Sequence, residues 1–238
     1  MEVKTIDLKK TVIENNDKDA EVLRVAMRKA GTYYMNIMSS PGSGKTTTLV
    51  STIKQLADTP VMHDGFIMKG GNTPAIGVME ADIDSDVDAK TIIRETGAVS
   101  VQLHTGGMCH LDADMSRQGL REIGSDDLDI VFLENVGNLV CPAEFDTGAV
   151  SKAVILSVPE GDDKPLKYPL MFQEADVVLV NKTDAMPAFD FSRDRFMDNV
   201  KKCNPDAAVF FISAKTGEGI GEWCGWLIDQ VTEFLKKR

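Results

Sequence analysis

A glycine-rich loop between positions 39 and 46 has the residues needed to bind phosphate groups. It reads Ser-Ser-Pro-Gly-Ser-Gly-Lys-Thr between an apolar run and a helix-forming segment. Glycines let backbone N–H groups approach a phosphate chain, a helix N-terminus adds a favourable dipole, a lysine reaches the outer phosphates and a threonine hydroxyl can bind magnesium. The strict pattern has glycine where this chain has Ser39, so a loop without function is the alternative. The expected phosphate-binding residues are Gly42, Ser43, Gly44, Lys45, Thr46 and Thr47.

Two later motifs, in the matching order along the chain, would select the base. Residues 181–184 read Asn-Lys-Thr-Asp and residues 213–215 read Ser-Ala-Lys, each after an apolar run. A carboxylate at Asp184 can accept hydrogen bonds from both guanine N1–H and N2–H, which adenine does not offer, so a site built around it should reject adenine. A backbone N–H of the second motif can bond guanine O6. The residues expected to bind GTP or GDP here are Asn181, Lys182, Asp184, Ser213, Ala214 and Lys215.

The apolar run 129–134 ends in a carboxylate, Glu134, and is followed by Gly137. Such a carboxylate lies next to the magnesium ion of a nucleotide site, and the glycine N–H is free to bond the terminal phosphate. Asp82 is expected to bind magnesium or position the attacking water, with Glu80 as the competing candidate. No glutamine follows Gly137, so slow intrinsic hydrolysis is expected. The expected catalytic set is Lys45, Thr46, Asp82, Glu134 and Gly137, with Mg²⁺ held by Thr46, Asp82 and Glu134.

A second kind of chemistry is indicated by Cys109-His110 and by Cys141, which lies seven residues after Glu134. Thiolate and imidazole ligands suit zinc, nickel or copper rather than magnesium or calcium. Three protein ligands are too few for a closed structural zinc site, so a position stays open for exchange or for a second subunit. The alternative is that both cysteines are ordinary buried residues and that His110 caps a helix. Core or structural roles are expected for Cys203, Cys224, His63 and His104.

Apolar runs and amphipathic segments alternate along the chain. Strands are expected at 33–39, 76–80, 99–103, 130–134, 153–158, 177–181 and 209–213, and helices at 46–56, 86–95, 112–122, 191–203 and 221–237. Continuous apolar strands that alternate with helices predict an α/β fold, a doubly wound and mostly parallel sheet of about seven strands. We divide the chain into a short N-terminal helical extension, 1–30, and a P-loop GTPase domain with an embedded metal site, 31–238. Val22, Leu23, Val25, Ala26 and Met27 are expected to form one face of the N-terminal helix.

The composition narrows the possible partners and location. The chain has 238 residues, 43% of them hydrophobic, and a formal net charge of −11, which argues against nucleic acid or an anionic membrane as the main partner. It has no run of 18 apolar residues and no apolar N-terminal stretch of the secretory kind. Four widely spaced cysteines are more often ligands or core residues than disulfides in a cytoplasmic protein. A cytoplasmic location is therefore expected.

Taken together, these motifs resemble the HypB family, the nickel-insertion GTPases of [NiFe]-hydrogenase maturation. The resemblance runs from about Asn36 to the C-terminus, and Ser39, unusual for a P-loop in general, is normal for this family. The stretches that carry it are 38–46, 109–113, 134–143 and 159–169, of which the last two, Glu-Asn-Val-Gly-Asn-Leu-Val-Cys-Pro-Ala and Pro-Glu-Gly-Asp-Asp-Lys-Pro-Leu-Lys-Tyr-Pro, are the most diagnostic.

The resemblance implies a GTPase that delivers nickel, with Cys109, His110 and Cys141 binding Ni²⁺ or Zn²⁺ at a homodimer interface that depends on GTP and metal. It also implies a HypA-type nickel accessory protein and a hydrogenase large subunit as partners. Residues 1–30 hold no cysteine and the chain has three histidines, so tight nickel capture and nickel storage are not expected. Two rivals remain. The sequence 134–141 argues against a urease-accessory GTPase, and intact nucleotide motifs argue against a metal-binding module with weak turnover.

Overall fold

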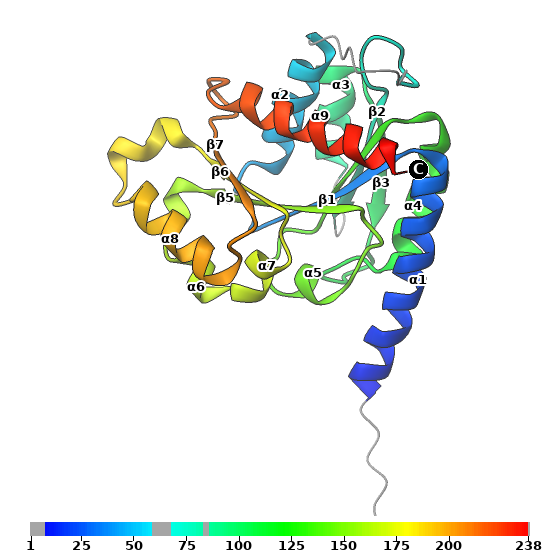
Figure 1. The fold of residues 1–238 in the computed structure, drawn as a ribbon, viewed down its shortest axis with the longest axis horizontal. Coiled ribbons are helices and arrows are strands. Elements are labelled where there is room, and N and C mark those ends of the chain that lie inside the picture. The colour runs from blue at the N-terminus through cyan, green and yellow to red at the C-terminus, as the bar shows by residue number, and fades with distance from the viewer. Residues whose placement is uncertain (1–7, 59–67, 83–85, 238) are drawn as a thin grey trace, which may run out of the picture.

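The computed structural model describes residues 8–58, 68–82 and 86–237. Its centre is one sheet of seven parallel strands, which lie in the spatial order β3-β2-β4-β1-β5-β6-β7 (Figure 1). This arrangement confirms the predicted doubly wound α/β fold. The strands are β1 (Tyr33–Ser39), β2 (Ile76–Asp82), β3 (Val99–His104), β4 (Ile130–Glu134), β5 (Ser151–Ser157), β6 (Val177–Asn181) and β7 (Ala208–Phe211).

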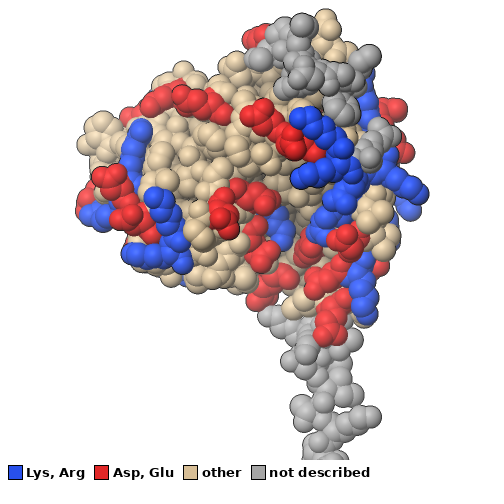
Figure 2. Space-filling model, viewed as in Figure 1, with Lys and Arg blue, Asp and Glu red and all other residues tan. Residues whose placement is uncertain are grey.

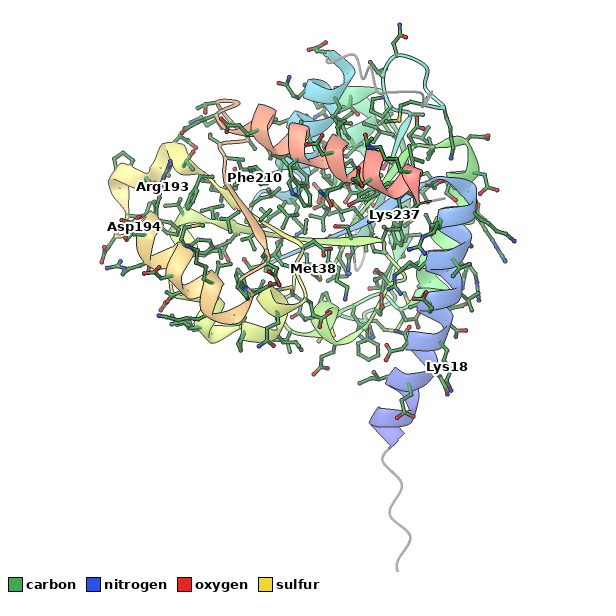
Figure 3. The ribbon with its side chains drawn as sticks, viewed as in Figure 1. Lys18, Met38, Arg193, Asp194, Phe210 and Lys237 are labelled. Atoms are coloured by element: carbon green, nitrogen blue, oxygen red, sulfur yellow. The ribbon has the colours of Figure 1, made fainter. Side chains whose placement is uncertain are left out.

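Helices cover both faces of the sheet. On one face, residues of α2, α3 and α9 share a hydrophobic cluster with Met35 and Ile37. On the other, α1 and α4 share a cluster with Tyr34, and α7 and α8 share one with Met38, since alternate residues of a strand point to opposite faces (Figures 1 and 3). The helices are α1 (Leu8–Ala30), α2 (Lys45–Asp58), α3 (Val87–Thr96), α4 (Ala113–Glu122), α5 (Cys141–Glu144), α6 (Lys164–Lys167), α7 (Pro169–Gln173), α8 (Arg193–Cys203) and α9 (Ile220–Lys236).

Parallel strands place all their carboxyl ends at one edge of the sheet, and the expected site residues follow those ends. β1 leads into the glycine-rich loop, β4 ends at Glu134 and β6 ends at Asn181. In an open α/β sheet, ligands bind outside this edge, where the strand order reverses. The boundaries differ from expectation at β7, which ends at Phe211, so that residues 213–215 lie in the loop after the strand.

The N-terminal helix is longer than expected and buries a different face. It spans 23 residues and packs against α4. Val22 and Val25 are 65% and 50% exposed, so their expected place on the buried face was wrong. A period of 3.6 residues explains the difference, because a stripe with steps of four, three and four residues stays on one side of the helix. The side chains buried along that stripe are Asn16, Ala20, Leu23 and Met27.

The charged side chains are mixed on the molecular surface. On the face shown in Figure 2, Asp and Glu side chains lie among Lys and Arg side chains rather than in one block. Among the helices that the structure describes, none combines the length and apolar character needed to cross a membrane. On this face of the molecule, therefore, neither sign of charge forms a block of its own.

Candidate nucleotide and metal sites

The glycine-rich loop packs directly on the first base-selecting motif. The Nδ2 atom of Asn181 donates a hydrogen bond to the carbonyl oxygen of Ser43 at 2.9 Å, and its Oδ1 atom accepts one from the N–H of Ala214 at 3.0 Å. Gly44 has a φ of +95°, and a Cβ atom placed there would lie 2.5 Å from Asn181 Nδ2. The close approach of the two loops therefore requires glycine at this position. One amide side chain joins three segments that were expected to bind nucleotide.

The other residues of the two base-selecting motifs also lie at the carboxyl edge of the sheet. Lys182 has a left-handed backbone, with a φ of 64°, and its Nζ atom donates to the carbonyl oxygen of Gly42 at 2.6 Å. The Ser213 hydroxyl donates to Asp184 Oδ1 at 2.7 Å, which orients the carboxylate expected to recognise guanine. The structure thus brings the phosphate loop and both motifs together. The exposed members of the set are Gly42, Thr47, Asp184 and Lys215.

Two buried carboxylates lie side by side behind the phosphate loop. Glu80 of β2 is paired in register with Glu134 of β4, and both are almost fully buried. Thr46 Oγ1 donates to Glu134 Oε1 at 3.0 Å, and Lys45 Nζ lies 3.9 Å from the same oxygen and 3.0 Å from Ser39 Oγ. Burial raises the pKa of Glu80 well above its ordinary value, and the negative charge of Glu134 raises it further. Burial also raises the pKa of Glu134.

The donor set at this point fits a magnesium ion. Within residues 8–58, 68–82 and 86–237, the buried atoms without a hydrogen-bond partner include Glu80 Oε1 and Glu134 Oε2. Carboxylate and hydroxyl oxygens are the ligands that magnesium prefers. Asp82 lies two residues beyond Glu80, beside His104 of β3 in the strand register, and is half-buried. Of the two acidic candidates on β2, Glu80 is the one directly opposite Glu134.

The three expected metal ligands are also brought together. Cys109 Sγ lies 2.9 Å from Cys141 Sγ and 3.7 Å from His110 Nδ1, and one ligand atom from each of the three residues lies within 4.8 Å of the others. The His110 ring stacks on Phe145, with ring centroids 3.8 Å apart. The hydrogen bond with Cys109 raises the pKa of the Cys141 thiol, and partial burial lowers the pKa of His110. Two thiols and a neutral imidazole form a donor set for a soft or borderline metal ion.

The remaining cysteine and histidine predictions have mixed outcomes. Cys224 is buried, as expected of a core residue, whereas Cys203 is half-buried, and its thiol donates to the carbonyl oxygen of Pro165 at 3.3 Å. His104 is exposed at the end of β3. His63 lies outside the described residues.

One short segment connects the two sites. It begins at Glu134 in the nucleotide site and ends at Cys141 in the metal cluster. At Gly137 the segment touches the phosphate loop, because a Cβ atom there would lie 3.2 Å from Pro41. A ligand that moves the phosphate loop or Gly137 would therefore act on the same stretch of backbone that carries Cys141, one of the expected metal ligands.

Three functional contacts were missed from the sequence. Asn36 in the middle of β1 accepts a hydrogen bond from Asn135 Nδ2 at 3.1 Å and so holds the start of the segment 134–141. The Ser40 hydroxyl of the phosphate loop donates to Glu160, which follows β5. Phe145 is the stacking partner of His110. Asn36 could have been found from the sequence, because it is a polar residue inside the apolar run of β1. The other two contacts join segments that are far apart in the sequence.

Comparison with known proteins agrees with this arrangement. Residues 33–211 match the family described as CobW/HypB/UreG, nucleotide-binding domain. Hydrogenase maturation factor HypB of Azotobacter chroococcum mcd 1 is 41% identical over 233 residues, which cover 98% of this chain and 72% of the relative. The HypB of Escherichia coli strain K12 is 41% identical over 219 residues, 92% of this chain and 70% of the relative. This chain belongs to the HypB family.

Solved structures of the HypB family have the same fold. The crystal structure of HypB from Helicobacter pylori in complex with nickel superposes with a TM-score of 0.79 at 35% identity, over 92% of this chain and 96% of that chain. HypB from Archaeoglobus fulgidus superposes with a TM-score of 0.79 at 34% identity, over 92% of this chain and 99% of that chain. These matches confirm the HypB resemblance that the sequence motifs predicted.

Proposed function

We propose that this protein is a GTP-hydrolysing metallochaperone that delivers nickel during [NiFe]-hydrogenase maturation. The observation that carries the proposal is the segment 134–141, which begins at a carboxylate of the nucleotide site and ends at a thiol of the metal cluster. The HypB relative from H. pylori was solved with nickel, which supports nickel as the cargo of this chain. In this proposal, nucleotide state sets metal affinity and dimerisation through that segment.

For hydrolysis, each expected residue has a defined task. Lys45 and the loop amides stabilise charge on the transferred phosphoryl group, and Asp184 selects guanine. Thr46 and Glu134, with Asp82 or Glu80, would hold magnesium, which neutralises phosphate charge when bound. Asn138 stands where many GTPases have a glutamine that orients water, so we expect turnover below about 1 s⁻¹ without a partner. A phosphate-release assay with GTP and with ATP tests both the rate and the base preference.

The metal half of the proposal is tested by a nickel titration followed by thiolate-to-nickel charge-transfer absorbance. The titration is run with GDP and then with a non-hydrolysable GTP analogue, on the wild type and on Cys141→Ser. We expect a thiolate signal that differs between the two nucleotides and is lost in Cys141→Ser, while Cys203→Ser, a matched cysteine outside the cluster, keeps it. Intact GTPase activity without any thiolate signal would show that the protein is a GTPase with another purpose.

Partners and location follow from the family and remain part of the proposal. We propose a homodimer that forms with GTP and metal, a HypA-type accessory protein as nickel partner and a hydrogenase large subunit as client. All four cysteines are unpaired thiols, which fits the reducing cytoplasm.

A second client class has one observation in its favour, because the relative from Helicobacter hepaticus, 38% identical, is a hydrogenase/urease maturation factor. Deleting the gene and assaying both enzymes, with and without added nickel, separates the two clients.

A further inference from the structure

The buried side of α1 carries a polar residue, Asn16, that bonds to two separate segments of the chain. Its side chain is 8% exposed. The Oδ1 atom accepts a hydrogen bond from the N–H of Ala113 at 2.9 Å, and the Nδ2 atom donates to the carbonyl oxygen of Asp146 at 2.9 Å. Buried amides are generally satisfied, but here the two ends of one amide reach residues that are 33 positions apart in the sequence.

Each of these two segments carries part of the metal cluster. Ala113 begins α4 three residues after His110, and Asp146 follows Phe145, the residue that stacks on the His110 ring. Cys141 lies five residues before Asp146 on the same segment. The relative position of the segments 109–113 and 141–146 determines whether the thiol of the second lies within reach of the thiol and imidazole of the first. Asn16 bonds to both segments.

We propose that Asn16 is a positioning residue for the metal cluster, which holds the two ligand-bearing segments at the separation that metal binding needs. The inference rests on the proposed metal-binding function. The N-terminal helix thereby has a role in positioning the metal cluster, although it supplies none of the three expected ligands. Residues that support metal ligands from outside typically change metal affinity by roughly 10–100-fold when they are removed.

A second residue of α1 also bonds to the segment that follows Cys141. Arg24 lies eight residues after Asn16, about two helical turns away, and its guanidinium pairs with Asp146 Oδ2 at 2.6 Å and donates to the carbonyl oxygen of Ala149 at 3.0 Å. The helix also packs tightly on Gly148, where a Cβ atom would lie 2.9 Å from Leu23 Cβ. The segment after Cys141 is therefore fixed along one side of α1, and Asn16 alone of these residues also reaches the segment of His110.

A purely structural task for Asn16 makes a different prediction. Ala113 provides the first backbone N–H of α4, and Asp112 already caps that helix by accepting from the N–H of Met115 at 2.8 Å. If Asn16 only completes this cap, Asn16→Asp should replace it fully, since a carboxylate still accepts from Ala113. The same substitution removes the N–H donor to Asp146 and so breaks the link between the two segments.

The test compares Asn16→Ala and Asn16→Asp with Asn15→Ala, a neighbouring asparagine that is exposed. The first readout is the nickel titration by charge-transfer absorbance, and GDP affinity is the reference. The second readout needs no metal. Diamide takes up two hydrogens as the Cys109 and Cys141 thiols form a disulfide, and mass spectrometry of the linked peptide gives the rate. We expect both Asn16 variants to bind nickel about tenfold more weakly and to cross-link more slowly, with GDP affinity and Asn15→Ala unchanged.

Two results would overturn the inference. If Asn16→Asp binds nickel and cross-links as the wild type does, Asn16 serves only as a helix cap. If that variant loses nickel and GDP affinity in parallel, the substitution destabilises the whole protein. If Asn16→Ala does not fold, Asn16→Asp decides the question, because it keeps the cap. If the wild type takes up no nickel, the proposed function fails, whereas the cross-linking rates still decide whether Asn16 holds the two segments together.

Discussion

At the scale of single residues, the adjacent carboxylates of Glu80 and Glu134 are the most unusual feature of the nucleotide site. Two acids side by side in a buried position cannot both ionise easily, so the folded protein keeps a proton that the unfolded chain would release. The Thr46 hydroxyl donates to Glu134 and Lys45 Nζ lies 3.9 Å from the same carboxylate, which favours the charged form of Glu134 and leaves Glu80 as the acid with the greater tendency to hold the proton. If Glu80 is a ligand, a cation that binds between the two carboxylates would therefore compete with that proton.

A substitution at Glu80 tests this account through stability. Because its pKa is raised above the ordinary 4.5, the folded state binds the proton more tightly than the unfolded state, and stability falls as pH rises from about 4.5 toward the raised pKa. Glu80→Gln cannot ionise and should escape this decline, which amounts to about 1.4 kcal/mol for each unit of pKa shift. Melting curves are recorded at pH 5 and pH 8, without nucleotide or magnesium. The melting temperature of the variant relative to the wild type should be higher at pH 8 than at pH 5. The exposed Glu122→Gln is the control, and a gap that stays constant with pH would contradict the account.

Base selection is a second residue-scale prediction. Asp184 is oriented by the Ser213 hydroxyl at 2.7 Å, and its carboxylate is the group that we expect to accept two guanine N–H groups. Asp184→Asn replaces one acceptor oxygen by a donor and should shift preference from guanosine toward xanthosine nucleotides, since each mismatched polar contact in such a site is strongly unfavourable. Competition of GTP and XTP for a fluorescent nucleotide measures the shift. Unchanged selectivity, together with hydrolysis of ATP by the wild type, would refute the assignment.

At the scale of elements, the phosphate loop, β6 and the loop after β7 are joined through one amide. A side chain at Gly44 would collide with Asn181 Nδ2 at 2.5 Å, whereas Gly42 also has a positive φ but faces open space. Gly44→Ala should therefore lower the free energy of unfolding by about 1–3 kcal/mol more than Gly42→Ala, because both carry the backbone strain and only the first disrupts a buried hydrogen-bond network. Urea unfolding without nucleotide measures the difference. Equal losses would mean that Asn181 moves aside freely.

The sequence predicted the elements well where the signal is local. Apolar runs located all seven strands to within two residues at most boundaries, because parallel strands buried on both faces need continuous apolar sequence. The stretch before β2 could not be assigned, since its anchor is distant. Within its described part, the Asp129 carboxylate accepts hydrogen bonds from the backbone N–H groups of Lys69, Gly70 and Ala75. The metal ligands were predicted by residue type, but the contacts of Asn16 and Phe145 join segments that no local pattern connects.

At the scale of the whole molecule, two ligand sites share one piece of backbone. The segment 134–141 touches the phosphate loop at Gly137 and supplies Cys141 to the cluster, while α1 bonds through Asn16 to the segments on both sides of that cluster. A nucleotide that shifts the segment changes the distance between Cys141 and the first two ligands. Because Cys141 is joined to the nucleotide site by this segment, the proposed function predicts coupling between GTP and metal binding rather than two independent sites.

Coupling of this kind must be reciprocal. If exchanging GDP for a GTP analogue changes nickel affinity by some factor, nickel must change the relative affinity for the two nucleotides by the same factor, typically about 5–150-fold for coupled sites. Six dissociation constants, two for nickel with each nucleotide and four for each nucleotide with and without nickel, should agree with one thermodynamic cycle. The constants are measured at several protein concentrations. If the protein dimerises when both ligands are bound, the apparent affinities will increase with protein concentration. Cys141→Ser should remove the coupling while leaving GDP affinity intact. A wild-type nickel affinity that is the same with GDP and with the GTP analogue would contradict the coupling.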